Sequence, residues 1–291
     1  MRRVLAALLV AGAAGGVAVA QERRQDGASP RPPAAQAADA LPAPNVALPR
    51  DPGRLATMLT ATISRLRAAL ESWDGRRAVP REVTYLALHH QRMLRLMTTS
   101  RPLGDKALRR LPQSVRGEAR DTVRGRRHLA DIPRSTGRLP RLRVADAAPA
   151  AQLRRHYATA QRRFGVHWTV LASINFVESA FGRVRSASEA GAHGPMQFLP
   201  STWRRYGMGG DIDDPRDAIL AAANYLRGSG ARSNLDRALF AYNRSTSYVR
   251  AIRRFAARMR ADERTFLTYY AWQVYARTPS GVRRLTGPGR G

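Results

Sequence analysis

A single acid, Glu178, closes an apolar stretch of the chain, and a segment rich in turn-forming residues follows it. The apolar side chains before it recur at helical spacing, and they are Trp168, Val170, Leu171, Ile174 and Val177. We expect a helix whose last turn places Glu178 against apolar neighbours. Because removal from water favours the neutral form of a carboxyl, Glu178 could protonate the oxygen of a glycosidic bond. This pattern favours the cleavage of sugar polymers.

Two further motifs follow Glu178 in a fixed order. The first runs from Ser188 to Gln197 as Ser-x-x-Gly-Ala-x-Gly-x-Met-Gln, and the second is Ala241-Tyr242-Asn243. Together with Glu178-Ser179-x-Phe, they resemble the lytic transglycosylases of bacterial cell walls. Three motifs in the correct order are far more specific than any one of them alone. The resemblance extends from Gln152 to Tyr275.

The resemblance combines two branches of that family. Ser188 and Gln197 are nine positions apart, as in the soluble members, whereas Glu178 and Ser188 are ten apart, one more than expected. Pro195 and the run from Tyr242 to Val249 look more like the membrane-bound B-type branch. A one-residue loop insertion accounts for the longer interval, and we interpret the sequence as a hybrid of the two branches.

The resemblance implies a role for each motif residue. Glu178 would act first as general acid and then as general base, so that the muramoyl C6 hydroxyl attacks C1 and leaves a 1,6-anhydro end without consuming water. Ser188 and Gln197 would hydrogen-bond the N-acetyl sugar, and Tyr242 would bring its phenol toward the acid. Asn243 would orient the loop. The substrate-side residues are therefore Ser188, Met196, Gln197, Tyr242 and Asn243, with Met196 packing beneath the site. For Tyr242, core packing is the alternative interpretation.

Two other functions compete with transglycosylation. Goose-type lysozymes share the Met-Gln motif but carry aspartates where this chain has Ser188 and Leu199, so no base for water stands at those positions. Glu189 could restore a second acid if it faced the site, which leaves a hydrolytic muramidase as an alternative; exposed loop acids are usually solvated surface. A non-catalytic wall-binding scaffold is the rival outside the enzymes, and the intact Glu178 and Gln197 weigh against it.

The charge is strongly basic, with 50 Lys and Arg against 21 Asp and Glu, a net charge of +29. Nucleic acid would be one partner for such a chain. The arginines are spread over every segment, and neither a recognition helix nor a stacking-sheet motif accompanies them, so we predict no specific nucleic acid. Anionic wall polymers are a better match for an exported cation, through long-range attraction. The alternative is a solvated basic surface with no specific partner.

Composition divides the chain into six segments. Residues 1–20 have the basic, apolar and Ala-x-Ala parts of a cleavable export signal, so we expect a periplasmic, wall-associated or extracellular protein with no transmembrane anchor after cleavage. A Pro- and Ala-rich linker, 21–50, precedes a helical unit, 51–131. A connector, 132–150, leads to the catalytic domain, 151–277, and a flexible tail, 278–291. The helical unit would serve as a platform or as a wall-binding or partner-docking module.

The expected fold is all-α, with a lysozyme-like catalytic domain preceded by the helical unit. We expect helices after Asp51-Pro52 and after Pro80, a third stretch from Lys106 to Leu129 broken at Pro112, and an aromatic-rich helix containing Phe266, Tyr269, Tyr270, Trp272 and Tyr275. A small β-hairpin near the cleft, between Gly182 and Gly194, would fit such a fold. Without cysteine, and with six histidines at no metal-ligand spacing, the sequence predicts neither a metal nor a cofactor.

Overall fold

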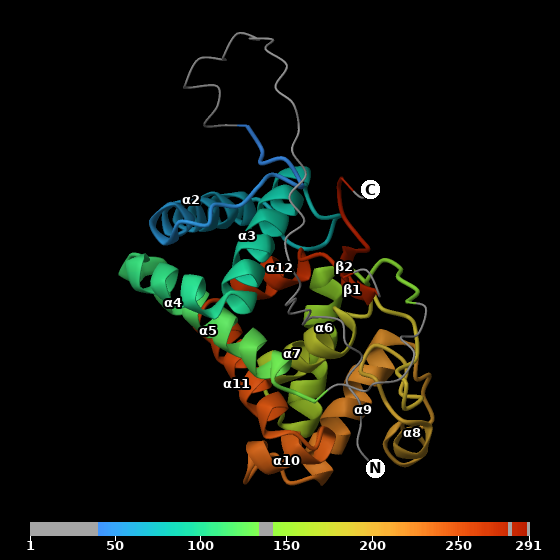
Figure 1. Ribbon diagram of the computed structural model, residues 1–291. Helices are drawn as coiled ribbons and strands as arrows, with labels where there is room; N and C mark the ends of the chain where they lie inside the picture. The colour runs from blue at the N-terminus through green and yellow to red at the C-terminus, as the bar shows by residue number, and fades with distance from the viewer. Residues whose placement is uncertain (1–39, 134–141, 279–280, 290–291) are drawn as a thin grey trace, which may run out of the picture.

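Residues 40–133, 142–278 and 281–289 are described by a computed structural model of the chain (Figure 1). The predicted export signal, 1–20, and the linker residues 21–39 lie outside this part. Helices and one two-stranded antiparallel sheet make up the described residues, which confirms the all-α prediction. The elements are α2 Pro52–Glu71, α3 Arg81–Thr99, α4 Arg101–Arg110, α5 Gln113–Ala130, α6 Ala150–Phe164, α7 Trp168–Ser179, α8 Pro200–Tyr206, α9 Pro215–Gly228, α10 Leu235–Tyr242, α11 Thr246–Ala261, α12 Arg264–Tyr270, β1 Tyr275–Thr278 and β2 Gly281–Arg284.

The N-terminal helices begin and break where the turn chemistry predicts. Asp51 caps α2 by accepting a hydrogen bond from the backbone N of Arg54 at 2.8 Å, and α4 and α5 are separated at Pro112. The helix before this break begins at Arg101 rather than at Lys106. Pro102 permits the earlier start, because a proline in the first turn of a helix sacrifices no intrahelical hydrogen bond.

Helix α7 is buried along its whole length. Its apolar residues face every direction, as in helices that other elements surround. It packs against α6, α9 and α11. Phe176, two residues before Glu178, stacks on Tyr269 of α12 with ring centroids 4.9 Å apart and meets Phe255 of α11 edge-on at 5.2 Å. This aromatic packing fixes the axis of the helix that carries Glu178.

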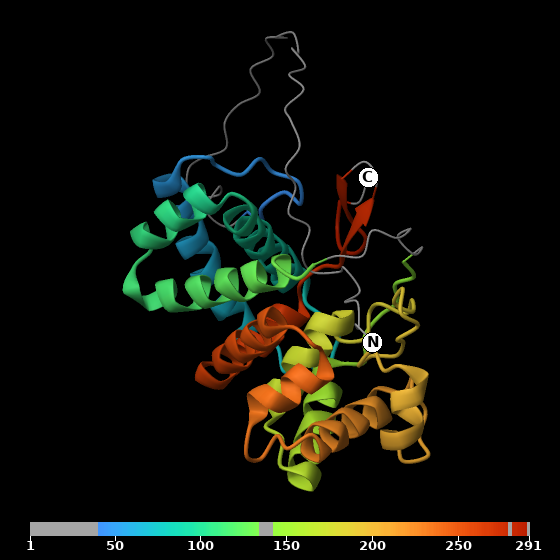
Figure 2. The same ribbon diagram turned by 60° about the horizontal axis from the view of Figure 1, so that its bottom comes forward.

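The N-terminal helices and the predicted catalytic domain share one hydrophobic core. Helix α5 lies along α11, and both views show the two helices side by side (Figures 1 and 2). The approach is close at Gly125, where a Cβ atom would come within 2.9 Å of the Phe255 ring. The described residues of the 132–150 connector therefore do not separate two cores. The role of the N-terminal helices, as a platform or as a docking module, stays a prediction.

The expected extent of the aromatic-rich helix was wrong. The aromatic helix α12 ends at Tyr270, so Trp272 lies beyond it and Tyr275 belongs to β1. Gln91 of α3 explains the end of the helix, because its side-chain amide donates to the carbonyl of Gln273 at 2.8 Å and accepts from the backbone N of Gln273 at 2.9 Å. These two bonds hold the chain in an extended conformation as it leaves the helix.

The small sheet forms from β1 and β2, and not between Gly182 and Gly194. Around the latter region the described residues form only two isolated bridges, Val144 with Val184 and His193 with Phe198. Strand β2 lies within the predicted tail, 278–291, and Arg284 bonds the carbonyl of Pro44. The end of the predicted linker thus lies against the hairpin.

Gly104→Ala and Gly117→Ala are expected to change stability in opposite directions, although both glycines lie in helices. A Cβ atom at Gly104 would sit 2.1 Å from the backbone oxygen of Met97, whereas nothing lies within 4 Å of one at Gly117. Gly117→Ala should raise the free energy of unfolding by about 1 kcal/mol. Gly104→Ala should lower it by about 2 kcal/mol. Urea denaturation measures both, and stabilisation by Gly104→Ala would contradict the close α3–α4 packing.

Two adjacent histidines, His89 and His90, are buried on α3. Burial lowers the pKa of each to about 4; Arg92 adds to the effect at His89, while Glu118, 4.0 Å from the His90 ring, opposes it. The indole N–H of Trp272 points at Nδ1 of His90 from 3.4 Å. An acceptor at that nitrogen requires the neutral ring.

We expect the folded state to lose stability as the pH falls from 7 to 4.5. An unfolded histidine has a pKa near 6.5, above the folded value, so the unfolded chain binds more protons in this window. The full contribution of these histidines to the free energy of unfolding is present above about pH 7. At pH 4.5, about 2 kcal/mol of that free energy is lost per histidine. Urea denaturation at a series of pH values measures the slope. The His90→Asn variant should show a flatter slope, and an unchanged slope would contradict the assignment to His90.

Candidate functional site

Glu178 lies in the last turn of α7 and is 5% exposed. The helix ends just beyond it, where Ala180 and Phe181 both adopt left-handed backbone angles, φ 52° and φ 65°. Consecutive non-glycine residues in this region are uncommon and cluster at functional sites. The predicted position of Glu178, at the end of an apolar helix, is confirmed.

The partner of the acid is Tyr248, whose hydroxyl donates to Oε1 of Glu178 at 2.8 Å. Tyr248 is fully buried in the first turn of α11, and the Ser245 side chain caps this helix by accepting from the backbone N of Tyr248. The sequence analysis gave Tyr248 no role. The signal was present: a serine three residues before a tyrosine marks the start of a helix and places that tyrosine in its first turn.

The phenol expected beside the acid was that of Tyr242, and the structure differs here. The Tyr242 hydroxyl donates to the backbone oxygen of Met196 at 2.6 Å. Tyr242 is the last residue of α10 and is fully buried. It therefore holds the Met196 segment in place, whereas the hydroxyl on Glu178 comes from the next helix. Met196 itself is fully buried, as expected of a packing residue.

Ser188 shapes the loop that follows α7. Its side-chain oxygen accepts from the backbone N of Ala192 at 3.0 Å, and its backbone N donates to the carbonyl of Ala192 at 2.7 Å. These bonds close a tight loop around Gly191, in which Glu189 is exposed. The hydroxyl of Ser188 thus has a structural partner within its own loop. The exposure of Glu189 is that of a solvated surface acid.

Gln197 has a buried side-chain oxygen that could accept a hydrogen bond from a ligand. Its amide nitrogen donates to the carbonyl of Gly194 at 3.1 Å, while its Oε1 is buried without a hydrogen-bond partner among the described residues. The backbone around it is constrained, since Gln197 has φ 49° and Gly194 has φ 76°. Gly194 must be glycine, because a Cβ atom there would lie 2.1 Å from the carbonyl oxygen of Ile212. A buried acceptor without a partner is costly unless a ligand satisfies it.

A polar clamp ties this segment to α7. The side chains of Asn175 and Ser179 both donate to the carbonyl of Pro195, Asn175 from 2.8 Å. Tyr157 of α6 donates to Oδ1 of Asn175 at 2.6 Å and so fixes the amide. All three side chains are fully buried. Because Asn175 and Ser179 flank Glu178 on the same helix, the clamp fixes the distance between the acid and the Met196-Gln197 backbone.

Asn243 ends α10 in an extended conformation, and its carbonyl accepts from the backbone N of Ser245 at 2.7 Å. The residue is buried. It connects α10 to α11, so it helps to place the helix that carries Tyr248. Its expected role of orienting the loop agrees with this position, and a direct contact with substrate stays a prediction.

Neither a metal site nor a membrane span emerges from the described residues. No group of three or more His, Cys, Asp or Glu side chains in residues 40–133, 142–278 and 281–289 could hold a metal ion. Within the same ranges, no helix has the length and apolar character needed to cross a bilayer.

Asn175→Ala is expected to lower the free energy of unfolding by about 3 kcal/mol, because it leaves the Pro195 carbonyl and the Tyr157 hydroxyl with fewer buried partners. Ser173→Ala is the matched control, since the buried Ser173 hydroxyl bonds only its own helix, at the carbonyl of Thr169. That change should cost about 1 kcal/mol. If chemical denaturation gave the same loss of unfolding free energy for both variants, the hydrogen bonds of the clamp would add no stability beyond that of an ordinary buried hydroxyl.

Comparison with known proteins identifies one part of the chain. Residues 156–264 match the family model described as Transglycosylase SLT domain. The chain is also similar to the membrane-bound lytic murein transglycosylase F of Thiobacillus denitrificans, with 35% identity over 112 residues, which is 36% of this chain and 23% of that protein. The chain thus matches about a quarter of that relative's length. No solved structure matches. Both findings confirm the resemblance to lytic transglycosylases, and the residues that match the family model include Glu178, Tyr248 and the clamp.

Proposed function

We propose that this protein is a peptidoglycan lytic transglycosylase that cleaves the β-1,4 bond between N-acetylmuramic acid and N-acetylglucosamine. The observation that carries the proposal is the buried Glu178 with its hydrogen bond from Tyr248. This pair lies within the residues that match the transglycosylase family model. One acid held in a fixed orientation is the minimum that the reaction requires.

In the proposed reaction, Glu178 performs two proton transfers. Its carboxylic acid protonates the glycosidic oxygen as the bond to C1 breaks. The resulting carboxylate then takes the proton from the muramoyl C6 hydroxyl while that oxygen attacks C1. The products are a 1,6-anhydromuramoyl end and a new N-acetylglucosamine end, and Glu178 returns to its starting state. Because the nucleophile belongs to the substrate, the reaction needs no second carboxylate to activate water.

Tyr248 and Gln197 act as positioning groups in this proposal. The Tyr248 hydroxyl donates to Oε1 of Glu178 and so fixes the orientation of the carboxyl group relative to the glycosidic oxygen. A donor on one carboxylate oxygen also stabilises the charged form that results from the first transfer. The buried Oε1 of Gln197 accepts no hydrogen bond among the residues of known placement. An amide N–H or a hydroxyl of an N-acetyl sugar would satisfy it.

Hydrolysis is the weaker alternative on the same geometry. A muramidase needs a base that activates water, and the positions where goose-type lysozymes carry aspartates hold Ser188 and Leu199. The Ser188 hydroxyl is engaged within its own loop, and Glu189 is exposed. These observations favour intramolecular attack by the C6 hydroxyl.

The decisive test is mass spectrometry of the fragments that the protein releases from purified peptidoglycan. We expect anhydromuramoyl products from the native chain. Glu178→Gln should lower their rate of release by about 1,000-fold, because it preserves the shape of the side chain and removes the proton donor. Tyr248→Phe should lower it about 10- to 100-fold, the loss expected for one hydrogen bond to a charged group.

Tyr85→Phe is the control, because the hydroxyl of this α3 tyrosine has no hydrogen-bond partner among the described residues. The change should leave the rate within about twofold. Products with reducing ends would identify a muramidase instead and would make Glu189 the next position to change. If the native chain and Glu178→Gln bind peptidoglycan equally and release nothing, the protein is a wall-binding scaffold.

We further propose that the chain is exported and stays near the wall by charge. The export signal predicted in residues 1–20 supports the first part. The net charge of +29 supports the second, because wall carboxylates and anionic wall polymers would attract such a protein over about a Debye length. Binding to isolated walls should then weaken as salt is raised.

A further inference from the structure

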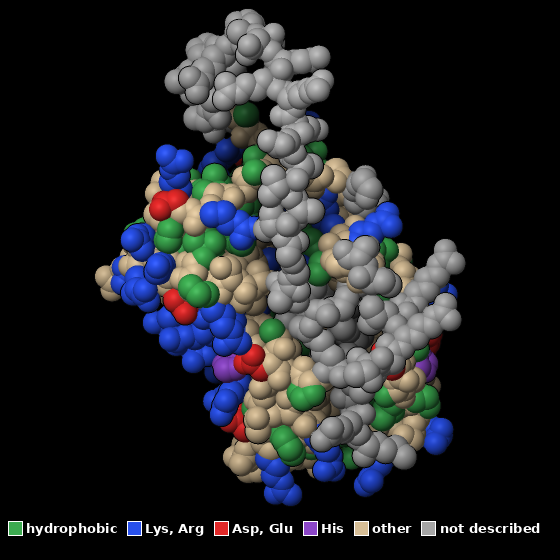
Figure 3. Space-filling model, viewed as in Figure 1, with side chains coloured by type: hydrophobic (Ala, Val, Ile, Leu, Met, Phe, Trp, Pro, Cys, Tyr) green, Lys and Arg blue, Asp and Glu red, His purple; other side chains and the backbone are tan. Residues whose placement is uncertain are grey.

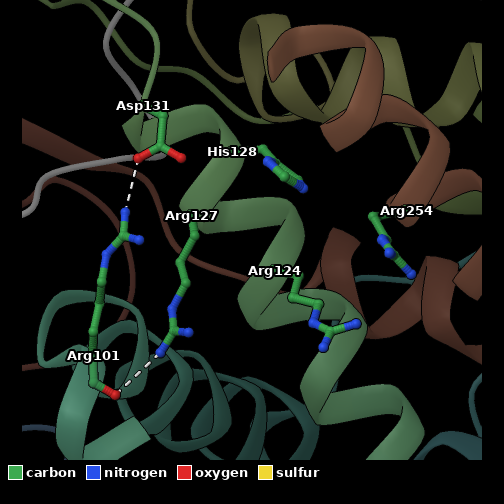
Figure 4. A pocket seen from close by; sticks show the side chains of 6 residues that line it. All are labelled: Arg101, Arg124, Arg127, His128, Asp131 and Arg254. Carbon is green, nitrogen blue, oxygen red and sulfur yellow. Dashed lines mark hydrogen bonds and ion pairs between the residues drawn. The ribbon is translucent and has the colours of Figure 1, made fainter. Parts of the chain in front are cut away.

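A pocket of about 270 Å³ lies on the N-terminal helices and is lined mainly by basic side chains (Figure 4). Figure 3 shows Lys and Arg side chains gathered on this face of the molecule, next to a histidine. The lining residues are Arg101, Arg124, Arg127, His128, Asp131 and Arg254. None of them belongs to the site around Glu178.

Close packing of α5 on α11 builds the pocket. Arg124 and His128 are four residues apart on α5, and therefore lie on one face of that helix. Arg254 of α11 faces them, because Gly125 lets the two helices approach. Arg101, at the start of α4, and Asp131, which caps the end of α5, complete the wall and join at 2.8 Å. The donors thus come from three separate helices.

The carboxylates around the pocket do not balance its guanidinium groups. Asp131 pairs with Arg101, Asp105 pairs with Arg127 at 2.7 Å, and Asp121 pairs with Arg254 at 3.2 Å. Arg124 has no carboxylate within 4.0 Å among the residues that the structure describes, and its side chain points into the pocket (Figure 4). One full positive charge is therefore uncompensated at the centre of the basic face.

The pKa of His128 responds to the same excess of positive charge. Burial lowers its pKa first, and the positive charges of Arg250, Arg254 and Arg124 lower it further, while Asp131 opposes them. The groups that face the ring thus come from both α5 and α11. An anion in the pocket would reverse the effect of the arginines and would favour the protonated imidazole.

We propose that this pocket binds a phosphate group, either free or at the end of a larger molecule. Arg124 and Arg254 would supply paired N–H donors to its oxygens, and His128 would add a third donor. The guanidinium plane matches the spacing of phosphate oxygens and holds them through two parallel bonds. The pocket has room for one tetrahedral anion. A dianion also compensates more than one guanidinium, which a carboxylate cannot do.

Isothermal titration of the full chain with inorganic phosphate, at constant ionic strength, tests the proposal. Arg124→Gln and Arg254→Gln should each weaken binding about tenfold, the loss expected for a charge-assisted bond. Arg237→Gln is the matched control, because it removes one positive charge from an exposed position on α10, away from the pocket. This change should alter binding less than about twofold. The Arg124 side chain forms no hydrogen bond or ion pair within the described part of the chain, so its replacement should leave the circular dichroism spectrum unchanged.

A second readout follows the His128 ring by nuclear magnetic resonance. At a phosphate concentration that just saturates the native chain, the His128 pKa should rise equally in the native chain and in Arg237→Gln, and should rise less in Arg124→Gln, whose site is then only partly filled. Acetate at the same ionic strength should bind at least tenfold more weakly. Vesicles of phosphatidylcholine with added phosphatidic acid show whether the bound phosphate group belongs to a lipid. If the chain binds these vesicles but not free phosphate, and Arg124→Gln weakens that binding, the phosphate group is that of a lipid. Equal losses in all three arginine variants, or no binding to either probe, would overturn the site.

Discussion

A carboxyl group buried at the end of an apolar helix needs a hydrogen-bond partner, and the hydrogen bond from Tyr248 meets this need for Glu178. The bond joins α7 to α11, so the acid is oriented only while those helices keep their relative position. Phe176 and Phe255 maintain that position through edge-on packing. The other motif residues are arranged around this pair, with the Pro195 carbonyl clamped by Asn175 and Ser179 on either side of the acid.

The helices that precede the family match contribute to the same arrangement. Helix α11 lies between α7 and α5. One side of α11 carries Tyr248 and packs against α7, and the other side packs against the N-terminal helices. Gly125 makes the contact close. The interface also creates the arginine-lined pocket, because it brings α5 and α11 side chains of like charge together. The interface between α5 and α11 therefore supports the helix that orients Glu178 and also concentrates positive charge on another face of the protein.

The sequence predicted those features that local chemistry determines. The cap at Asp51, the break at Pro112 and the placement of Glu178 at a helix end follow from short-range rules and are confirmed. Features that depend on distant contacts were missed. The end of α12 is set by Gln91, which lies 182 residues away, and no local pattern near Tyr270 reveals it. The choice of Tyr248 over Tyr242 as the partner of the acid depends on the orientation of α11, which tertiary packing decides.

The shared core has a consequence for the evolutionary independence of the catalytic segment. A fragment limited to residues 151–277 would lose α5 and α3, and with them the contacts of Gly125 with Phe255 and of His90 with Trp272. Large aromatic surfaces exposed in this way promote association between chains. Gene fusion or shuffling could thus move this segment to another protein only together with its N-terminal helices, or after replacement of the residues that face them. The unit of inheritance would be larger than the segment that matches the family model.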